Sequence, residues 1–276
     1  MAELRVIITG AGGRMGAANL RALAAHPDLA LHAAVDRPGS PVLGRDAGTL
    51  AGLEAMGVPV TDSIDAVLDG ADAIIDFTVP AASVALAHRA ARSGLIHVIG
   101  TTGCTPEDDA AITQAAQAGA RIVKSGNFSL GMAVLSNLVA QAAAALADYD
   151  IEIVEMHHNK KVDAPSGSAL ILGEAAARGR AVSLAEKSVR VRDGHTGPRE
   201  PGTIGFATLR GGTVVGDHSV IFAGPSERLE LGHRAEDRTI FANGALRSAL
   251  WARNQPAGLY TIADVLGLSP ISRTPS

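Results

Sequence analysis

The stretch from Leu4 to Gly16, "LRVIITGAGGRMG", decides how the N-terminal part of this chain folds. Its first six residues form a β-branched apolar run that predicts a buried strand, and a helical pattern follows the glycines. Glycines at such a junction permit a tight turn and the close approach of a pyrophosphate, which the helix N-terminus then stabilises. The spacing is G-x-x-G-x-x-G rather than G-x-G-x-x-G, although Gly12 adds a further glycine. A tight turn without a ligand is the alternative to a dinucleotide site.

Outward from this turn, short apolar runs alternate with Ala-rich helical stretches as far as residue 130. This alternation is typical of a parallel sheet with crossover helices, so we predict a Rossmann-type, doubly wound α/β domain. The further strands are expected at Leu29–Val35, Ala73–Phe77, His97–Gly100 and Ile122–Lys124. Helices are expected to begin near Arg14, Pro80 and Pro106.

Asp36 and Arg37 follow the second predicted strand, with Asp36 lying 20 residues beyond Gly16. A carboxylate at this place accepts hydrogen bonds from the ribose hydroxyls of a dinucleotide. Arg37 is suited to a 2′-phosphate, and its alternative is a solvated loop charge. Asp36 favours NADH and Arg37 favours NADPH, so we expect NADH, NADPH or both as cofactor.

Two more polar loops end predicted strands, "GTTG" at Gly100–Gly103 and "SGNF" at Ser125–Phe128. Ligands of open α/β sheets lie in the crevice at the carboxyl ends of the strands. We therefore expect these loops to contact the nicotinamide half of the cofactor. The alternative is ordinary turn chemistry.

Beyond residue 130 the pattern changes to a long apolar helix over Met132–Asp150, a strand over Ile151–Met156 and a β-rich region from Ser188 to Gly232. These elements predict a separate α+β domain with a mixed or antiparallel sheet. A helical pattern resumes at Thr239–Ala252, and we expect the C-terminal segment to return to the first domain. The expected domains are therefore residues 1–130 with 239–276, for the dinucleotide, and residues 131–238, for the substrate.

The segment "EMHHNKKVDAPSGSAL", Glu155–Leu170, concentrates titratable side chains at a predicted strand-to-helix junction. Histidine transfers protons near neutral pH, and lysine donates a proton or holds a carboxylate. The alternatives are a hydrogen-bonded structural histidine at His157 or His158 and surface charge at Lys160 and Lys161. A metal site needs a third ligand and only Asp163 is near, so we expect no metal. We expect the cluster to face the cofactor crevice across the domain interface.

The helix entry within that segment is a second feature of the cluster. Ser166, Gly167 and Ser168 place hydroxyl and backbone N–H groups at a predicted helix N-terminus, which binds carboxylates or phosphates. An ordinary N-cap made by Ser166 is the alternative. With Lys161 nearby, we predict a proton donor beside a carboxylate-binding site.

Composition excludes several classes of protein. The net charge of −4 and pI of about 6.1 argue against general binding to nucleic acid or to anionic membranes. The single cysteine, Cys104, allows no internal disulfide, and no Cys/His zinc spacing occurs. The first residues are unlike a signal peptide, and no apolar stretch approaches the roughly 18 residues that a membrane span needs. We expect a soluble, cytoplasmic protein.

Taken together, "GAGGRMG", "GTTG", "NFSLG", "EMHHNKKVDAPSGSAL" and the tail "ANGALRSALWARNQPAGLYTIADVLGL" resemble the 4-hydroxy-tetrahydrodipicolinate reductase (dihydrodipicolinate reductase) family over nearly the whole chain. The resemblance implies NAD(P)H-dependent reduction of a cyclic imine dicarboxylate in the diaminopimelate route to lysine, by a homotetramer assembled through the sheet domain. It implies His157 as proton donor/acceptor and Lys161 as proton donor, with substrate bound by His158, Lys161, Ser166, Gly167 and Ser168. The implied cofactor contacts are Gly10, Ala11, Gly12, Gly13, Arg14, Met15, Asp36, Arg37, Gly100, Thr101, Thr102, Ser125, Gly126, Asn127 and Phe128.

Two residues depart from the family pattern. Ser168 stands where the family usually has Thr, and Cys104 stands where a bulkier apolar residue is commoner.

Two other functions are alternatives to the reductase. One is a semialdehyde dehydrogenase with Cys104 as nucleophile, which needs a histidine base near the thiol. The other is a non-catalytic dinucleotide sensor, which does not need His157, Lys161 and an anion site together.

Overall fold

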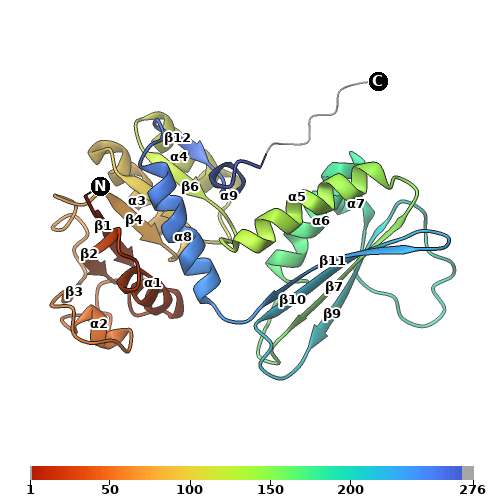
Figure 1. The fold of residues 1–276 in the computed structure, drawn as a ribbon, viewed down its shortest axis with the longest axis horizontal. Coiled ribbons are helices and arrows are strands. Elements are labelled where there is room, and N and C mark those ends of the chain that lie inside the picture. The colour runs from red at the N-terminus through yellow and green to blue at the C-terminus, as the bar shows by residue number, and fades with distance from the viewer. Residues whose placement is uncertain (1, 269–276) are drawn as a thin grey trace. The chain divides into compact units, whose positions relative to one another are not determined.

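A computed structural model describes residues 2–268, and the predicted positions 1 and 269–276 of the first domain lie outside the described residues. The described chain divides into two compact units (Figure 1). The first contains residues 2–129 and 238–267, and the second contains residues 130–237 together with Leu268. The roles expected for the two domains stay a prediction.

The first unit is built on a sheet of seven strands, within residues 2–268, in the order β12-β6-β5-β4-β1-β2-β3, with every pair parallel. The strands are β1 (Leu4–Thr9), β2 (Leu29–Val35), β3 (Val60–Thr61), β4 (Ala73–Asp76), β5 (Ile96–Ile99), β6 (Arg121–Lys124) and β12 (Gly258–Tyr260). The chain runs outward from β1 in one direction through β2 and β3, and in the other through β4 to β6. This reversal of strand order between β1 and β4 is the switch point at which doubly wound sheets bind their ligands, so the expected fold class is confirmed.

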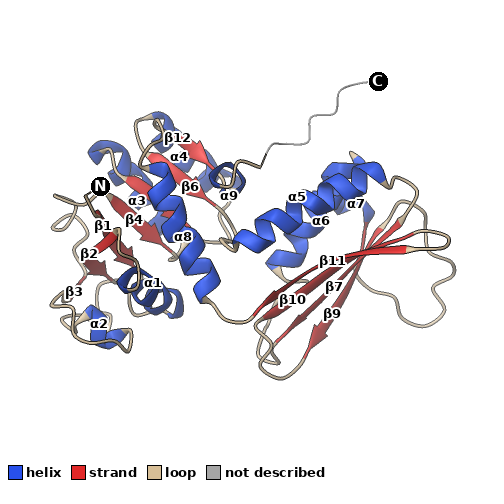
Figure 2. Ribbon diagram, in the orientation of Figure 1, coloured by secondary structure: helices blue, strands red, loops and turns tan. Residues whose placement is uncertain are grey.

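Helices lie on both faces of this sheet, with α1 packed beside α8 and α3 packed beside α4 (Figure 2). The helices are α1 (Arg14–Ala24), α2 (Ala47–Leu50), α3 (Pro80–Ser93), α4 (Pro106–Gln117), α8 (Thr239–Ala252) and α9 (Ile262–Val265). Because both faces are covered, the central strands are apolar on both, and Ile7, Ile8, Ile74 and Ile75 are fully buried. The C-terminal segment joins this unit through α8 and through β12, which pairs with β6.

Local sequence signals explain where two of the helices begin. Pro80 and Pro106 occupy the first turns of α3 and α4, where a missing N–H costs nothing. Thr105 accepts from the N–H of Asp108, and the Asp108 carboxylate accepts from the N–H of Thr105, which forms a capping box. Gly94 ends α3 in the left-handed conformation.

The second unit contains a sheet of five strands, within the described residues, in the order β11-β10-β7-β9-β8. The strands are β7 (Asp150–His157), β8 (Ser188–Val189), β9 (Ile204–Arg210), β10 (Gly216–Ala223) and β11 (Arg228–Ala235). β7 is antiparallel to β10 and parallel to β9, so the sheet is mixed. The helices α5 (Leu130–Ala145), α6 (Gly167–Arg180) and α7 (Leu184–Lys187) belong to this unit, and α5 and α6 cover one face of the sheet (Figure 2).

Strand β7 alternates between this covered face and the opposite face. Ile151 and Ile153 are buried in the core, and Glu155 and His157 continue the same alternation toward the end of the strand. On β10, His218 lies on the same face as the buried Val220. The covered face is therefore apolar at one end of the sheet and carries buried ionisable side chains at the other.

The β-rich region expected over Ser188–Gly232 is interrupted, because residues 190–203 form no strand or helix. Gly194, Gly197, Pro198, Pro201 and Gly202 explain the interruption, since glycine and proline are unfavourable inside strands. The segment is attached to β7 by ion pairs in which Arg192 and Arg199 contact the carboxylate of Glu152. The final strand of the sheet in sequence, β11, extends to Ala235, beyond the region expected from sequence.

Gly244 sets how closely α8 packs on the chain that follows β6. A Cβ atom at Gly244 would lie 1.8 Å from the carbonyl oxygen of Phe128, a backbone atom that cannot rotate away. We expect Gly244→Ala to lower the free energy of unfolding by about 2–3 kcal/mol, since overpacking typically costs roughly 1–3 kcal/mol or more. Denaturant unfolding measures this change. Gly167→Ala is the matched control in a helix, because nothing lies within 4 Å of the added atom, and equal losses in both variants would contradict the packing argument.

Candidate functional site

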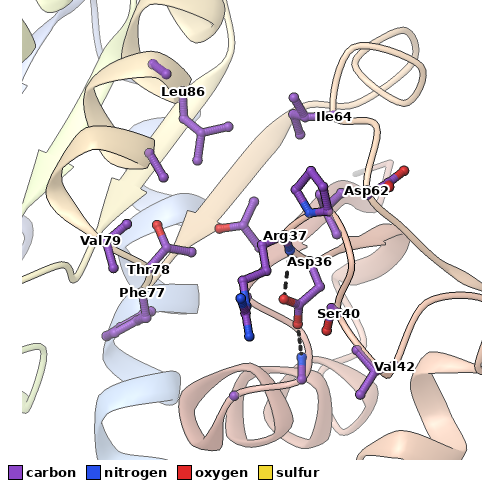
Figure 3. A pocket seen from close by; sticks show the side chains of 18 of the residues that line it. Asp36, Arg37, Ser40, Val42, Asp62, Ile64, Phe77, Thr78, Val79 and Leu86 are labelled. Atoms are coloured by element: carbon purple, nitrogen blue, oxygen red, sulfur yellow. Dashed lines mark hydrogen bonds between the residues drawn. The ribbon is translucent and has the colours of Figure 1, made fainter.

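The first unit contains a cavity of about 660 Å³ at the carboxyl ends of β1, β2 and β4. Figure 3 shows Asp36 and Arg37 beside Ser40 and Val42, with Phe77, Thr78 and Val79 across the cavity from them. The Gly-rich turn supplies Gly10, Gly12 and Gly13 to the lining. The cavity therefore lies at the switch point between β1 and β4.

Close backbone approaches explain two glycines of the turn between β1 and α1. A Cβ atom at Gly16 would lie 2.2 Å from the carbonyl oxygen of Gly10, so no other residue permits this helix to start so near the strand. A Cβ atom at Gly12 would lie 2.7 Å from Oδ2 of Asp36. The absence of a side chain at Gly12 allows its N–H to reach that carboxylate. These features fit a dinucleotide, which needs close approach to the backbone at a helix N-terminus.

The Asp36 carboxylate is held by two backbone groups at the end of β2. The N–H of Gly12 donates to Oδ2 at 2.6 Å, and the N–H of Arg37 donates to Oδ1 at 2.7 Å (Figure 3). Each carboxylate oxygen can accept more than one hydrogen bond, so ribose hydroxyls can still be bound. Asp36 and Arg37 both line the cavity.

The structure divides the predicted cofactor contacts into two groups. Those that line the cavity are Gly10, Gly12, Gly13, Asp36 and Arg37. Those outside its lining are Ala11, Arg14, Met15, Gly100, Thr101, Thr102, Ser125, Gly126, Asn127 and Phe128. Sequence reasoning missed Phe77, Thr78 and Val79, although they follow a buried strand just as the "GTTG" and "SGNF" loops do.

A buried carboxylate joins two of these loops. Asp76, at the end of β4, accepts from Thr78 N–H at 3.0 Å and lies 2.6 Å from Ser83 Oγ and 3.2 Å from His97 Nε2. The hydroxyl of Thr101 lies 3.0 Å from Thr78 N and 2.8 Å from Ser83 Oγ, so this side chain turns inward. Burial works to raise the pKa of Asp76, but the His97 ring and the hydroxyls lower it below its ordinary value. The network ties the loop after β4 to the loop after β5.

The second unit contains a separate cluster around Glu155, whose side chain is 1% exposed. Its Oε2 lies 2.6 Å from His157 Nδ1 and accepts from Arg210 at 2.9 Å. Its Oε1 accepts from Arg210 at 3.0 Å and from the N–H of Ser166 at 3.0 Å. Burial acts to raise the pKa of Glu155, but the bonds from Arg210, His157 and Ser166 hold it below its ordinary value.

Two histidines meet at this cluster. The rings of His157 and His218 lie edge to face with centroids 5.2 Å apart, and His218 Nε2 lies 3.1 Å from Ser166 Oγ. Burial lowers the pKa of His157, although Glu155 opposes this change. The pKa of His218 is lowered to about 4, mainly by burial and to a smaller extent by the neighbouring His157. His218 is therefore neutral at physiological pH. Sequence reasoning missed His218, Arg210 and the role of Glu155. Alternation along β7 and β10 is a signal for Glu155 and His218, whereas the burial of β9 does not alternate and gives no such signal for Arg210.

The loop between β7 and α6 carries Lys161. Its ammonium group donates to both carboxylate oxygens of Asp163, at 2.8 and 2.9 Å. His158 is the first residue of this loop after β7, and its N–H donates to the Val214 carbonyl at 2.7 Å. The loop therefore keeps Lys161 close to the end of the strand that carries His157.

The helix α6 begins immediately after this loop. Ser166 is its N-cap, accepting from the N–H of Ala169 at 3.1 Å. Gly167 and Ser168 form the first turn of α6. The predicted substrate-site residues His158, Lys161, Ser166, Gly167 and Ser168 therefore gather at one end of the sheet of the second unit.

Cys104 does not fit the role of a covalent nucleophile. Burial raises the pKa of its thiol, and the positive charge of Lys124 only partly offsets this change. A raised pKa disfavours the thiolate, which is the reactive form of cysteine. Cys104 packs partly buried against the core beneath α3 and α4.

Residues 2–268 contain no helix that is long and apolar enough to cross a membrane. Within the same residues, no group of three His, Cys, Asp or Glu side chains is arranged to hold a metal ion.

Comparison with known proteins covers almost the entire chain. The family described as "Dihydrodipicolinate reductase, N-terminus" matches residues 4–128, and "Dihydrodipicolinate reductase, C-terminus" matches residues 131–266. A 4-hydroxy-tetrahydrodipicolinate reductase of Rhizobium rhizogenes is 60% identical over 268 residues, which are 96% of this chain and 97% of that protein. The protein of the same name from Brucella abortus (strain 2308) is 58% identical over 266 residues, 96% of this chain and 99% of that protein.

A solved structure shows the same fold. The dipicolinate-bound dihydrodipicolinate reductase from Paenisporosarcina sp. TG-14 is similar with a TM-score of 0.76 and 24% identity, over 94% of this chain and 97% of that chain. The sequence matches confirm the resemblance stated from the motifs. The chain belongs to the 4-hydroxy-tetrahydrodipicolinate reductase (dihydrodipicolinate reductase) family.

Proposed function

We propose that His157 and Lys161 supply the proton chemistry of the reaction for which this family is named. That reaction is the NAD(P)H-dependent reduction of 4-hydroxy-tetrahydrodipicolinate to tetrahydrodipicolinate, in the diaminopimelate route to lysine. The observation that carries the assignment is the buried pair of Glu155 and His157 beside the N-terminus of α6. This arrangement combines a proton-transfer group with a site for a carboxylate.

The first unit is suited to hold the cofactor. Gly10, Gly12 and Gly13 allow a pyrophosphate to approach the backbone at the start of α1, and Asp36 offers acceptors for ribose hydroxyls. Arg37 in the same cavity can pair with a 2′-phosphate, so NADH and NADPH both fit. When bound, the cofactor supplies a hydride to the substrate. The loops at Gly100–Thr102 and Ser125–Phe128 remain proposed contacts to its nicotinamide half.

His157 is proposed as the proton donor/acceptor. Because Nδ1 faces the Glu155 carboxylate, the exchangeable position on the other side of the ring is Nε2. The protonated ring can donate from Nε2, and the neutral ring can accept there. The lowered pKa of His157 favours the neutral ring at neutral pH, while the Glu155 carboxylate stabilises the protonated form once a proton is taken up.

Lys161 is proposed to donate a proton and to bind a substrate carboxylate. Its ammonium group contacts Asp163, so a substrate carboxylate would replace or share that contact. Gly167 and Ser168 offer N–H and hydroxyl groups in the first turn of α6, where the helix dipole favours an anion. His158 and Ser166 complete the proposed substrate set.

The proposal extends to assembly and location. The dicarboxylate is a small-molecule partner, and we propose a cytoplasmic homotetramer assembled through the sheet of the second unit. Resemblance to the family supports the tetramer. The exposed apolar side chains of Leu209 on β9 and Leu229 on β11 are consistent with it. We propose no role in binding nucleic acid or membranes.

Asp36→Ala is expected to weaken the binding of NADH more than the binding of NADPH, because it removes the acceptor for the ribose hydroxyls while Arg37 remains. Loss of hydrogen bonds to a charged group predicts a rise in the NADH dissociation constant of roughly ten- to a hundredfold. Fluorescence titration with each cofactor measures both constants. Asp62→Ala is the matched control, since Asp62 is another carboxylate that lines the same cavity. Equal losses for NADH and NADPH would count against the ribose role.

Lys161→Ala is expected to lower kcat and raise KM for the imine together, since the side chain is assigned both a proton and a carboxylate. Steady-state assays of NADH oxidation with the substrate made in situ measure both constants. Lys160→Ala removes the neighbouring exposed lysine and should leave both constants nearly unchanged. If both variants behaved alike, Lys161 would be a surface charge.

His157→Gln is expected to lower kcat by about 10²–10⁴-fold with a much smaller change in KM, because glutamine keeps a hydrogen-bonding group but cannot exchange a proton at neutral pH. The NADH dissociation constant should be unchanged, since the nucleotide is assigned to the first unit. Kinetics and NADH titration on the same preparation test this. A variant with full kcat and normal NADH binding would show that His157 is a structural histidine.

A further inference from the structure

The side chain of Glu155 contacts three different groups around the proposed substrate site. It is almost fully buried on β7, and its two oxygens contact His157, Arg210 and the N–H of Ser166. A buried carboxylate with these partners is fixed in place, because leaving any of them unpaired would be costly.

We infer that Glu155 is a positioning residue for the reaction: it holds His157 with Nδ1–H toward the carboxylate and Nε2 toward the substrate, and it orders the Lys161 loop and the α6 N-terminus around that ring. This inference rests on the proposed role of His157. It assigns Glu155 no contact with the substrate. The carboxylate acts on the reaction through the ring and through Arg210.

The geometry at His157 supports the ring orientation. Nδ1 lies 2.6 Å from Glu155 Oε2, within hydrogen-bonding distance, and an ionised carboxylate can only accept. Nδ1 therefore carries the proton, and in the neutral ring Nε2 has the lone pair. A Cβ atom at Gly216 would lie 3.0 Å from Nε2, so a side chain at that position would crowd this ring nitrogen.

Arg210 carries the effect of Glu155 to the Lys161 loop. One guanidinium nitrogen, Nη2, donates to Glu155 Oε1 at 3.0 Å and to the carbonyl oxygen of Asp163 at 2.7 Å. Asp163 in turn accepts from the Lys161 ammonium group. A single carboxylate thus fixes a ring, a cation-bearing loop and a helix N-terminus.

The charges around His157 come from several elements. Glu155 on β7 favours the protonated ring, whereas Lys161 in the following loop and Arg210 on β9 disfavour it. The neutral ring of His218 on β10 lies against it, and His233 on β11 pairs with His218 across the two strands. Glu155 is the group in this set that raises the pKa of His157, so its removal should lower that pKa.

The test compares Glu155→Gln with Glu152→Gln, which lies on the same strand and also removes a carboxylate that pairs with arginine. We expect Glu155→Gln to lower kcat by roughly 10–100-fold, by analogy with the loss of the hydrogen-bond partner that orients a metal-ligating histidine. The His157-dependent limb of the pH profile should move to lower pH, because the carboxylate that raises the pKa of His157 is lost. NADH affinity should not change. Glu152→Gln should leave the pH profile in place.

A double-mutant cycle separates positioning from general stability. Because Glu155 acts in part through His157, the fold-loss of kcat caused by Glu155→Gln should be clearly smaller in a His157→Gln background than in the wild-type protein. Multiplicative losses, or an unmoved pH limb in the single variant, would overturn the inference. If His157→Gln itself kept full kcat, the proposed function would fail first, so the two failures are distinguishable.

A second measurement covers the case in which Glu155→Gln does not fold. Nitrogen-15 NMR of the histidines of the wild-type protein, with His157→Gln to assign the signal, reports which ring nitrogen carries the proton in neutral His157. The Nδ1–H tautomer is expected. The Nε2–H tautomer would overturn the inference.

Discussion

A carboxylate that is removed from water must receive hydrogen bonds from other groups, and each unit of this chain is arranged around one such carboxylate. Asp76 ends β4, in the middle of the parallel sheet, and Glu155 lies near the end of β7, in the middle of the mixed sheet. Both are held in the charged form against the effect of burial by the partners that surround them, which keep the pKa of each below its ordinary value. Because the partners belong to different strands, helices and loops, satisfying each carboxylate also fixes those segments relative to one another.

In the first unit this requirement shapes the wall of the cavity at the carboxyl ends of β1, β2 and β4. Thr78 and Ser83 come from the segment after β4, and Thr101 comes from the loop after β5. Their hydroxyl and N–H groups are committed to one network with Asp76 and His97, so the two loops are held together at the carboxyl edge of the sheet. The Thr101 hydroxyl is part of that support and does not line the cavity.

In the second unit the same requirement places buried ionisable side chains at the edge of the core. The inward face of β7 changes from Ile151 and Ile153 to Glu155 and His157 without a break in alternation. An imidazole in such a place loses water and therefore has a lowered pKa, while the neighbouring carboxylate limits that change. Burial and Glu155 thus act on the pKa of His157 in opposite directions.

Local sequence patterns were sufficient to predict the secondary-structure elements and the family. The β-branched run before the glycines, Pro80 and Pro106 at helix starts, and the "EMHHNKKVDAPSGSAL" segment act through neighbours in the chain, so periodicity and motif spacing were sufficient to place them. The three-dimensional structure was needed to show that Arg210 and His218 join the cluster around Glu155, and that Thr101 turns inward to the Asp76 network. These contacts join residues that are separated in the sequence. Arg210 and His218 lie on strands whose pairing and register no local pattern specifies, and a single-residue change of register would turn each of these two side chains to the opposite face.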